Sequence, residues 1–137
     1  MIAADSFSVL IDAGVALCQT LHLRDLLGVM MARVREAMDA EACSVMLLDE
    51  ATQTLRWEVA LGEGAGKLQT LSVPLGQGIS GRVAATGEAI RIDDVHRDPR
   101  WQGKRFDDAT GFVTRAVLCV PIRGRRKVIG VIQVLNK

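Results

Sequence analysis

The spacing of apolar residues changes once along this chain, near residue 40, and that change limits the folds it can adopt. Before it, apolar residues recur every three or four positions, which predicts two amphipathic helices over residues 5–21 and 23–39, joined at His22. After it, short apolar runs and alternating segments are typical of strands. The strand-forming part of the chain therefore follows the helical part.

The strand-like segments are arranged as hairpins. Residues 42–48 form an apolar run that a polar turn separates from residues 54–61, and residues 114–122 and 128–135 flank the basic turn 123–127. Alternation in the second segment places four residues on one face: Leu55, Trp57, Val59 and Leu61. Because hairpins build antiparallel sheets, the predicted fold class is α+β.

Weaker elements lie between the two hairpins. We expect a glycine-rich loop over 62–67, an extended segment over 68–75, a short helix over 78–87 that ends at its last glycine, and a strand over 89–92. Residues 93–112 form the longest irregular stretch, and long loops commonly carry function.

Composition excludes several classes of function. Among 137 residues, 17 Lys and Arg balance 16 Asp and Glu to give a net charge of +1, so no basic face for nucleic acid is expected. No apolar run reaches the roughly 18 residues of a membrane span, and the N-terminus does not resemble a signal peptide. These observations predict one cytoplasmic domain with neither a nucleic-acid nor a membrane partner.

Residues with reactive side chains are few and scattered. Cys18, Cys43 and Cys119 lie in apolar runs without CxxC spacing, which predicts buried thiols in a reducing compartment. His22 and His96 have no carboxylate or cysteine at the spacing of a metal site or a catalytic triad. We therefore expect no catalytic residue, no metal and no resident cofactor.

Three polar residues lie in or beside otherwise apolar strands: Ser44, Thr114 and Gln133. Alternation puts Ser44 on the face of Met46, and Gln133 on the face of Val131. A buried polar group without a partner costs about 1–3 kcal/mol. Two interpretations follow for each residue. It bonds backbone or water at a solvated edge, or it lines a concave small-molecule site. The residues alone leave both interpretations open.

The glycines of Gly76-Gln-Gly-Ile-Ser-Gly81 open and pack the short helix that follows them. The segment lacks the GxxxxGK[ST] pattern of a phosphate loop. Its backbone amides can still receive an anion, because the N-terminus of a helix presents unpaired N–H groups.

Five motifs follow one another in a specific order: Gly78-Ile-Ser-Gly-Arg-Val-Ala-Ala-Thr-Gly87, Ile92-Asp-Asp-Val95 with Asp98-Pro-Arg-Trp101, Phe106-Asp-Asp-Ala-Thr-Gly-Phe-Val-Thr-Arg115, Leu118-Cys-Val-Pro-Ile122, and Val128-Ile-Gly-Val-Ile-Gln-Val-Leu-Asn-Lys137. Together they resemble GAF domains, in particular the regulatory modules of cyclic-nucleotide phosphodiesterases and bacterial adenylate cyclases. The resemblance covers residues 5–137.

This resemblance implies a single GAF domain over residues 1–137, with the family's C-terminal helix absent from these residues. The family fold is a central antiparallel sheet of about six strands, with N-terminal helices on one face and a ligand pocket under short helices and loops on the other. The implied function is a regulatory sensor in a larger signalling protein, which binds a small molecule such as a cyclic nucleotide and signals to an effector domain. The alternative is an interaction module without a nucleotide ligand. In either case, a homodimer would form through the apolar stripe of the N-terminal helix, which includes Leu10 and Leu17.

In family members that bind cyclic nucleotides, the pocket residues match these positions: Ser44, Trp57, Glu58, Ile79, Ser80, Asp107, Thr110, Thr114 and Gln133. The resemblance implies that Trp57 stacks on a flat ring and that the backbone amides of Ile79 and Ser80 receive a phosphate. Glu58 would contribute mainly through its backbone unless the strand bulges.

The remaining implied roles are polar. Thr110 and Thr114 would donate hydroxyl protons to ligand oxygens, Gln133 would read a polar edge, and Asp107 would orient its loop or bond a sugar hydroxyl. The segment Asp107–Arg115 has a second interpretation as a network that anchors its own loop. Some GAF-fold proteins reduce methionine sulfoxide, but they need loop cysteines, which this sequence does not provide.

Overall fold

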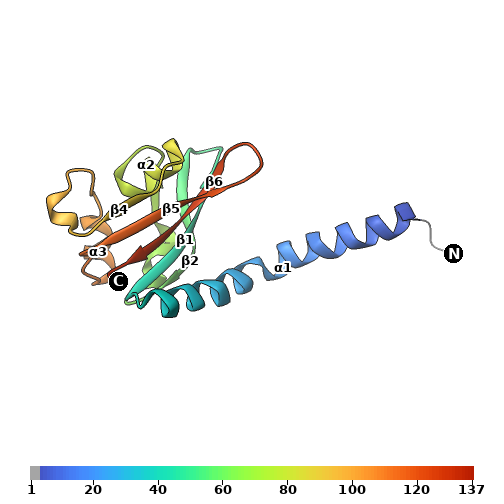
Figure 1. Ribbon diagram of the computed structural model, residues 1–137, viewed down its shortest axis with the longest axis horizontal. Helices are drawn as coiled ribbons and strands as arrows, with labels where there is room; N and C mark the ends of the chain where they lie inside the picture. The colour runs from blue at the N-terminus through green and yellow to red at the C-terminus, as the bar shows by residue number, and fades with distance from the viewer. Residues whose placement is uncertain (1–3) are drawn as a thin grey trace.

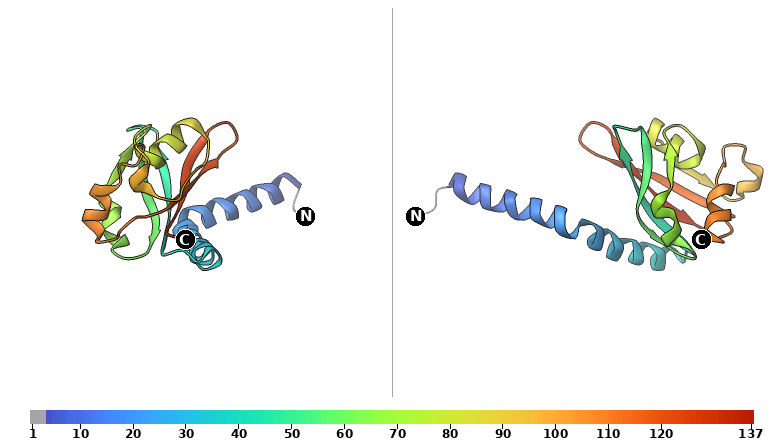
Figure 2. Two further views of the ribbon diagram at one scale, coloured as in Figure 1. Left: turned by 60° about the vertical axis from the view of Figure 1, so that its left-hand side comes forward. Right: turned by 180° about the vertical axis from the view of Figure 1, so that it is seen from behind.

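The computed structural model describes residues 4–137, without the side chains of residues 4–7 and 13–22. The helical part of the sequence forms one helix, α1 (Ala4–Met38), and the two separate helices predicted above were wrong. The backbone stays helical through His22 because neither a proline nor a left-handed residue ends it there. Figures 1 and 2 show the N-terminal half of α1 extending away from the sheet.

Six strands of the described chain form one antiparallel sheet in the order β3-β2-β1-β6-β5-β4. Their bounds are β1 Ala42–Asp49, β2 Thr54–Leu61, β3 Ser72–Pro74, β4 Ile90–Ile92, β5 Val117–Arg123 and β6 Val128–Leu135. The two predicted hairpins are β1–β2 and β5–β6, and they meet where β6 pairs with β1. The predicted α+β class with an antiparallel sheet is confirmed.

The segments between the hairpins are more helical than predicted. They contain η1 (Ala65–Thr70), α2 (Gly78–Thr86), η2 (Val95–Arg97) and α3 (Lys104–Thr110). Helix α2 ends at Gly87 with φ 74°, as predicted. The expected extended segment 68–75 is a strand only over β3, and the expected irregular stretch 93–112 holds η2 and α3. The unpredicted helices η1, η2 and α3 are each too short to produce a recognisable helical period in the sequence.

The two faces of the sheet carry separate clusters of buried residues. On one face, the C-terminal half of α1 packs Met31 against Val45 of β1. On the other face, Val83 of α2 packs against Met46 and Val131. The short helices lie on this second face, where residues of η1, α2, η2 and α3 join or pack against its cluster of buried residues (Figure 1). None of the described helices combines the length and apolar content that a bilayer crossing requires.

A β-bulge interrupts the pairing of β1 with β2. Met46 lies opposite Trp57, whereas its neighbour Val45 lies opposite Val59, so Glu58 is an extra residue in β2. The strand bends there, and the residues that follow change faces.

The bulge makes the predicted alternation of residues 54–61 wrong beyond Trp57. Leu55 packs on the α2 face as expected, but Val59 and Leu61 pack on the α1 face. The Glu58 side chain pairs with Arg24 of α1, with 3.3 Å between Oε1 and Nε.

Strand β5 begins three residues later than predicted, at Val117. Thr114 therefore lies before the strand. Its backbone N–H donates to the side chain of Asp107, and the amides of Arg115 and Ala116 donate to the side chain of Asn136. These amides bond side chains instead of a neighbouring strand, which is why the ladder starts after them.

Candidate functional site

A cavity of about 350 Å³ lies between the α2 face of the sheet and the short helices. Its volume falls in the range of small-molecule sites, about 300–1,000 Å³. All the site residues predicted from the sequence except Glu58 line it: Ser44, Trp57, Ile79, Ser80, Asp107, Thr110, Thr114 and Gln133. Glu58 is the exception because its side chain pairs with Arg24 of α1.

Aromatic side chains form much of the cavity wall. Both tryptophans and two of the three phenylalanines of the chain line it: Trp57, Trp101, Phe106 and Phe112. The rings of Trp57 and Phe106 meet edge to face, with centroids 5.0 Å apart and 64° between their planes. The guanidinium of Arg105 lies over the Phe106 ring, 4.4 Å from its centroid, and donates to the Ser72 carbonyl oxygen at 2.9 Å.

Sequence reasoning missed three of these rings, those of Trp101, Phe106 and Phe112. A usable signal was present, because only 4% of the residues are aromatic and these three fall within residues 93–112. Such a concentration of rings in one segment of an aromatic-poor chain indicates a wall that an apolar or flat ligand could contact.

The first turn of α2 faces the cavity through Gln77, Gly78, Ile79 and Ser80. Gln77 is the N-cap residue, and its side chain makes no capping hydrogen bond. The first amides of the helix therefore have no side-chain partner, and these N–H groups together with the helix dipole favour an anion. The structure places Ile79 and Ser80, whose amides the sequence singled out, among the residues that line the cavity.

Ser44 and Ser80 present hydroxyl groups to the same cavity, and their side chains are 4% and 6% exposed. Neither hydroxyl bonds another described residue, and no fully enclosed side-chain oxygen or nitrogen in the described chain lacks a partner. Both hydroxyls are therefore open to the cavity itself. Gln133 lies opposite Ser44 in the pairing of β6 with β1, so its amide adds donors and acceptors beside them.

Asp107 anchors the loop that leads into β5. Its Oδ2 accepts the Thr114 amide at 2.8 Å, and its Oδ1 accepts the Thr114 hydroxyl at 2.7 Å. The Thr110 hydroxyl donates to the Phe106 carbonyl oxygen at 2.9 Å and accepts the Phe112 amide at 3.1 Å.

Each threonine hydroxyl has a single proton, and these internal bonds use it. The loop-anchoring interpretation of Asp107–Arg115 therefore describes this structure. Donation of either hydroxyl to a ligand, as the resemblance implied, would first require an internal bond to break.

Two short elements meet over one side of the cavity. Gly64 precedes η1 with φ 69°, and a Cβ on it would lie 2.0 Å from the Thr110 carbonyl oxygen at the end of α3. The contact requires glycine both for its backbone conformation and for its lack of a side chain. It holds η1 against α3.

The described cysteines are not arranged as nucleophiles. Burial raises the pKa of the Cys119 thiol to about 12, although the Gln133 side chain opposes the shift. Burial also raises the pKa of the Cys43 thiol, whose Sγ donates to the Met31 carbonyl oxygen at 3.2 Å. A reactive cysteine needs the opposite shift. The side chain of Cys18 lies outside the described residues.

The histidine whose side chain the structure describes is not part of the cavity wall. His96 is exposed, does not line the cavity, and meets the Trp101 ring edge to face at 5.6 Å. Within the described part of the chain, no group of three or more His, Cys, Asp or Glu residues could hold a metal ion. The side chain of His22 lies outside the described residues.

A model of the GAF domain family matches residues 20–137. This chain belongs to the GAF family. GAF domains are regulatory modules that bind small molecules and lie beside effector domains. A probable 3',5'-cyclic phosphodiesterase of Caenorhabditis elegans is 30% identical over 112 residues, which cover 75% of this GAF domain and 15% of that protein. The chain thus spans a small part of this curated relative.

Solved structures share the fold. The GAF domain of a phosphoenolpyruvate-protein phosphotransferase from Acinetobacter is 26% identical with a TM-score of 0.73, covering 99% of this GAF domain and 79% of that chain. A free methionine-R-sulfoxide reductase from Neisseria meningitidis, solved with its substrate, is 20% identical with a TM-score of 0.68. The match covers 82% of this GAF domain and 62% of that chain. The second likeness concerns the fold alone.

Proposed function

We propose that this GAF domain is a sensor whose cavity binds a small ligand carrying a flat ring and an anionic group, with a cyclic nucleotide as the candidate. One observation carries the proposal: a single cavity joins aromatic rings to the uncapped N-terminus of α2. Trp57 and Phe106 would contact the ring, and the amides of Ile79 and Ser80 would receive the phosphate. An effector domain in the same polypeptide would receive the signal.

The polar groups of three cavity-lining residues would contact the ligand directly. They are the hydroxyls of Ser44 and Ser80, and the amide of Gln133, which also hydrogen bonds the Cys119 thiol. Asp107, Thr110 and Thr114 would act indirectly, because their polar groups already hold the loop that forms this side of the wall. The likeness to part of a cyclic phosphodiesterase supports a cyclic nucleotide as the ligand.

The test is a calorimetric titration of the domain with cyclic GMP and with cyclic AMP. Gln133→Leu and Phe106→Leu should each weaken binding by about 1–2 kcal/mol, through a lost hydrogen bond and reduced ring contact. Gln69→Leu is the control, because Gln69 is exposed and does not line the cavity. Absence of heat with both nucleotides would contradict the cyclic-nucleotide proposal, and native mass spectrometry of the purified domain would then test for another ligand.

A second property is proposed from α1. Leu10, in the stripe expected from the sequence, is 61% exposed, and the side chain of Leu17 lies outside the described residues. Further along the helix, other apolar side chains are exposed, among them Leu26 at 57%, Val29 at 62% and Met30 at 52%. They lie on a different side of the helix from Met31, which packs on the sheet. We propose that a second copy of the chain covers them, because a helix stripe of this kind buries its apolar surface against an equivalent stripe. Without a ligand, this homodimer would be the interaction-module function.

The proposal treats the domain as regulatory and not as a catalyst. The fold is shared with a methionine sulfoxide reductase, but the pKa values of Cys43 and Cys119 are raised, which disfavours the thiolate needed for that chemistry. A cytoplasmic location remains part of the same proposal.

A further inference from the structure

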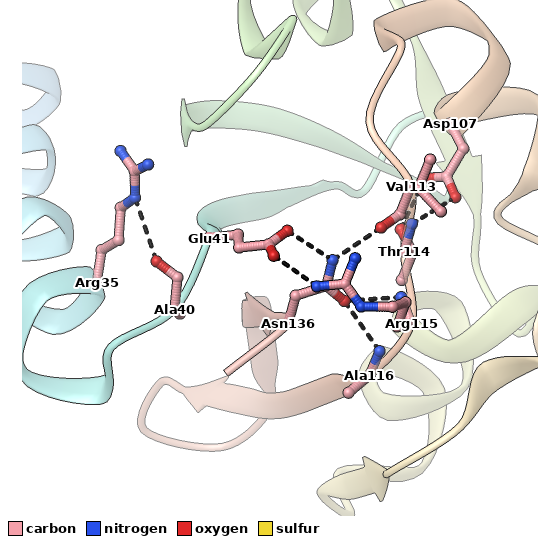
Figure 3. Close-up of polar contacts among 9 residues, drawn as sticks. All are labelled: Arg35, Ala40, Glu41, Asp107, Val113, Thr114, Arg115, Ala116 and Asn136. Atoms are coloured by element: carbon pink, nitrogen blue, oxygen red, sulfur yellow. Dashed lines mark hydrogen bonds and ion pairs between the residues drawn. The ribbon is translucent and has the colours of Figure 1, made fainter.

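Asn136 uses every polar group of its side chain in one junction, which Figure 3 shows. Its side chain is 6% exposed and follows the end of β6. Its Oδ1 accepts the backbone amides of Arg115 at 2.7 Å and Ala116 at 3.0 Å. Its Nδ2 donates to the Val113 carbonyl oxygen at 2.7 Å and to Glu41 Oε2 at 3.0 Å. Four residues from two distant parts of the chain thus converge on one amide.

On one side of Asn136 lies the cavity wall. Val113 is followed directly by Thr114, whose amide and hydroxyl both bond the cavity-lining Asp107. The segment of residues 113–116 is therefore held by Asp107 at one point and by Asn136 at the next. A displacement of α3 that moved Asp107 would change the geometry at Asn136.

On the other side lies the end of α1. Glu41 follows the helix after two residues, and its amide donates to the carbonyl oxygens of Leu135 at 3.2 Å and Asn136 at 3.3 Å. The Glu41 carboxylate also pairs with the Arg115 guanidinium. Arg35, in the last turn of α1, donates to the Ala40 carbonyl oxygen at 3.4 Å, which holds the residue before Glu41 against the helix end.

We propose that Asn136 is a positioning residue that couples the cavity wall to α1. It does not line the cavity, so it acts on α1 through the junction and not through ligand contact. Coupling between two sites needs an element that both of them bias, and here that element is the segment of residues 113–116. The coupling is a property of the protein itself, and only its use by a ligand rests on the proposed function.

The first experiment needs no ligand. Thr114→Val breaks the hydroxyl bond to Asp107 at the cavity, and amide hydrogen exchange of Glu41 reports the junction at α1. We expect Glu41 exchange to accelerate about fivefold more than exchange of Met46, the reference in the centre of the sheet. Thr86→Val is the matched control, because the Thr86 hydroxyl bonds a backbone carbonyl in α2 away from this junction.

The same measurement in an Asn136→Gly background separates coupling from general loss of stability. Glycine suits the φ of 55° at this position and keeps the carbonyl oxygen that accepts the Glu41 amide, so this variant removes only the side chain. Here Thr114→Val should change Glu41 and Met46 exchange by the same factor. The proposal would be overturned if Thr114→Val accelerated Glu41 exchange, relative to Met46 exchange, by the same factor in the wild type and in the Asn136→Gly background.

Asn136→Asp provides a second variant, which keeps an acceptor but places a second carboxylate beside that of Glu41. Its carboxylate can still accept the amides of Arg115 and Ala116, but it cannot donate to Val113 or Glu41. In this background, as in Asn136→Gly, Thr114→Val should accelerate Glu41 exchange no more than Met46 exchange. Retention of the extra acceleration in this variant would overturn the proposed route through Nδ2.

Saturating cyclic GMP or cyclic AMP is the ligand arm. A nucleotide that binds should alter Glu41 exchange in the wild type and have no such effect in Asn136→Gly. A nucleotide effect of equal size in both proteins would count against the coupling role. If neither nucleotide binds, the proposed function fails while the ligand-free comparison still decides the role of Asn136.

Discussion

Asp107 and Thr114 are joined by two hydrogen bonds, one from the threonine amide at 2.8 Å and one from its hydroxyl at 2.7 Å. This pairing gives the carboxylate two donors from one residue on the wall of the cavity. It also gives the Thr114 hydroxyl a structural partner before any ligand arrives. The effects of changing these residues should therefore appear first in the stability of the empty domain.

Thr114→Val should lower the free energy of unfolding by about 1–2 kcal/mol, because it leaves one oxygen of Asp107 without its donor. Thr86→Val, at an exposed threonine, should change it by much less. Urea titration measures both. Unchanged stability with weakened ligand binding would instead indicate direct contact of Thr114 with the ligand.

Gly64→Ala should destabilise the domain by at least about 1 kcal/mol, since φ there is 69° and the new Cβ would meet the Thr110 carbonyl oxygen. Gly66→Ala, in η1 itself, is the control because a Cβ there meets nothing within 4 Å. Thermal unfolding of both variants tests the contact. Equal melting temperatures for the two variants would mean that η1 does not rest on α3.

Leu26→Lys combined with Met30→Lys should convert a dimer into a monomer, because both side chains are exposed on α1. Glu88→Lys adds the same charge at an exposed position outside α1 and should leave the dimer intact. Sedimentation equilibrium distinguishes the two variants. A wild-type chain that is monomeric at high concentration would contradict the proposed homodimer.

Cys43 and Cys119 should react slowly with iodoacetamide at pH 8 in the folded domain and rapidly after unfolding. Burial raises the pKa of both thiols, that of Cys119 to about 12, so little thiolate forms in the native state. Peptide mass spectrometry assigns the modification to each cysteine. Rapid modification of either one in folded protein, together with turnover of methionine sulfoxide, would support a reductase.

Stability should decrease as the pH falls from about 4 to about 2, in part because of Asp98. Its hydrogen bond from the Arg100 side chain, followed by that from the Arg100 amide, lowers the pKa of its carboxyl from 3.8 to about 2. The unfolded chain therefore binds the proton first, and the contribution is present above pH 4 and lost below pH 2. Asp98→Asn should flatten this part of the urea-unfolding profile, whereas Asp108→Asn should retain it.

The strands and the short helix α2 could be predicted from the sequence because their signals are local. Apolar alternation and polar turns locate β1, β2, β5 and β6 to within a few residues, and Gly87 ends α2 with the backbone conformation that glycine favours. Polar residues within apolar strands pointed to Ser44 and Gln133, which do line the cavity. Their ligand contacts are still predictions.

Other features depend on partners that local patterns do not contain. The bulge at Glu58 exists only relative to β1, and it reverses the face of every later residue in β2. The continuity of α1 through His22 could not be predicted, because the helical period of apolar residues is too weak there. Helix α3 is too short to show such a period. Phe106 became a wall residue because α3 folds over the sheet.

The sequence alone therefore determined the order of the helical part, the two hairpins and α2, the antiparallel class of the sheet and the polar residues on its inner face, because spacing along the chain specifies which residues share a face. Only the tertiary structure decided what those residues contact. Asn136 and Glu41 are 95 positions apart, yet their side chains bond at 3.0 Å where β6 ends and β1 begins. Such a contact depends on strand register and on the path of the chain between them, which no local spacing records.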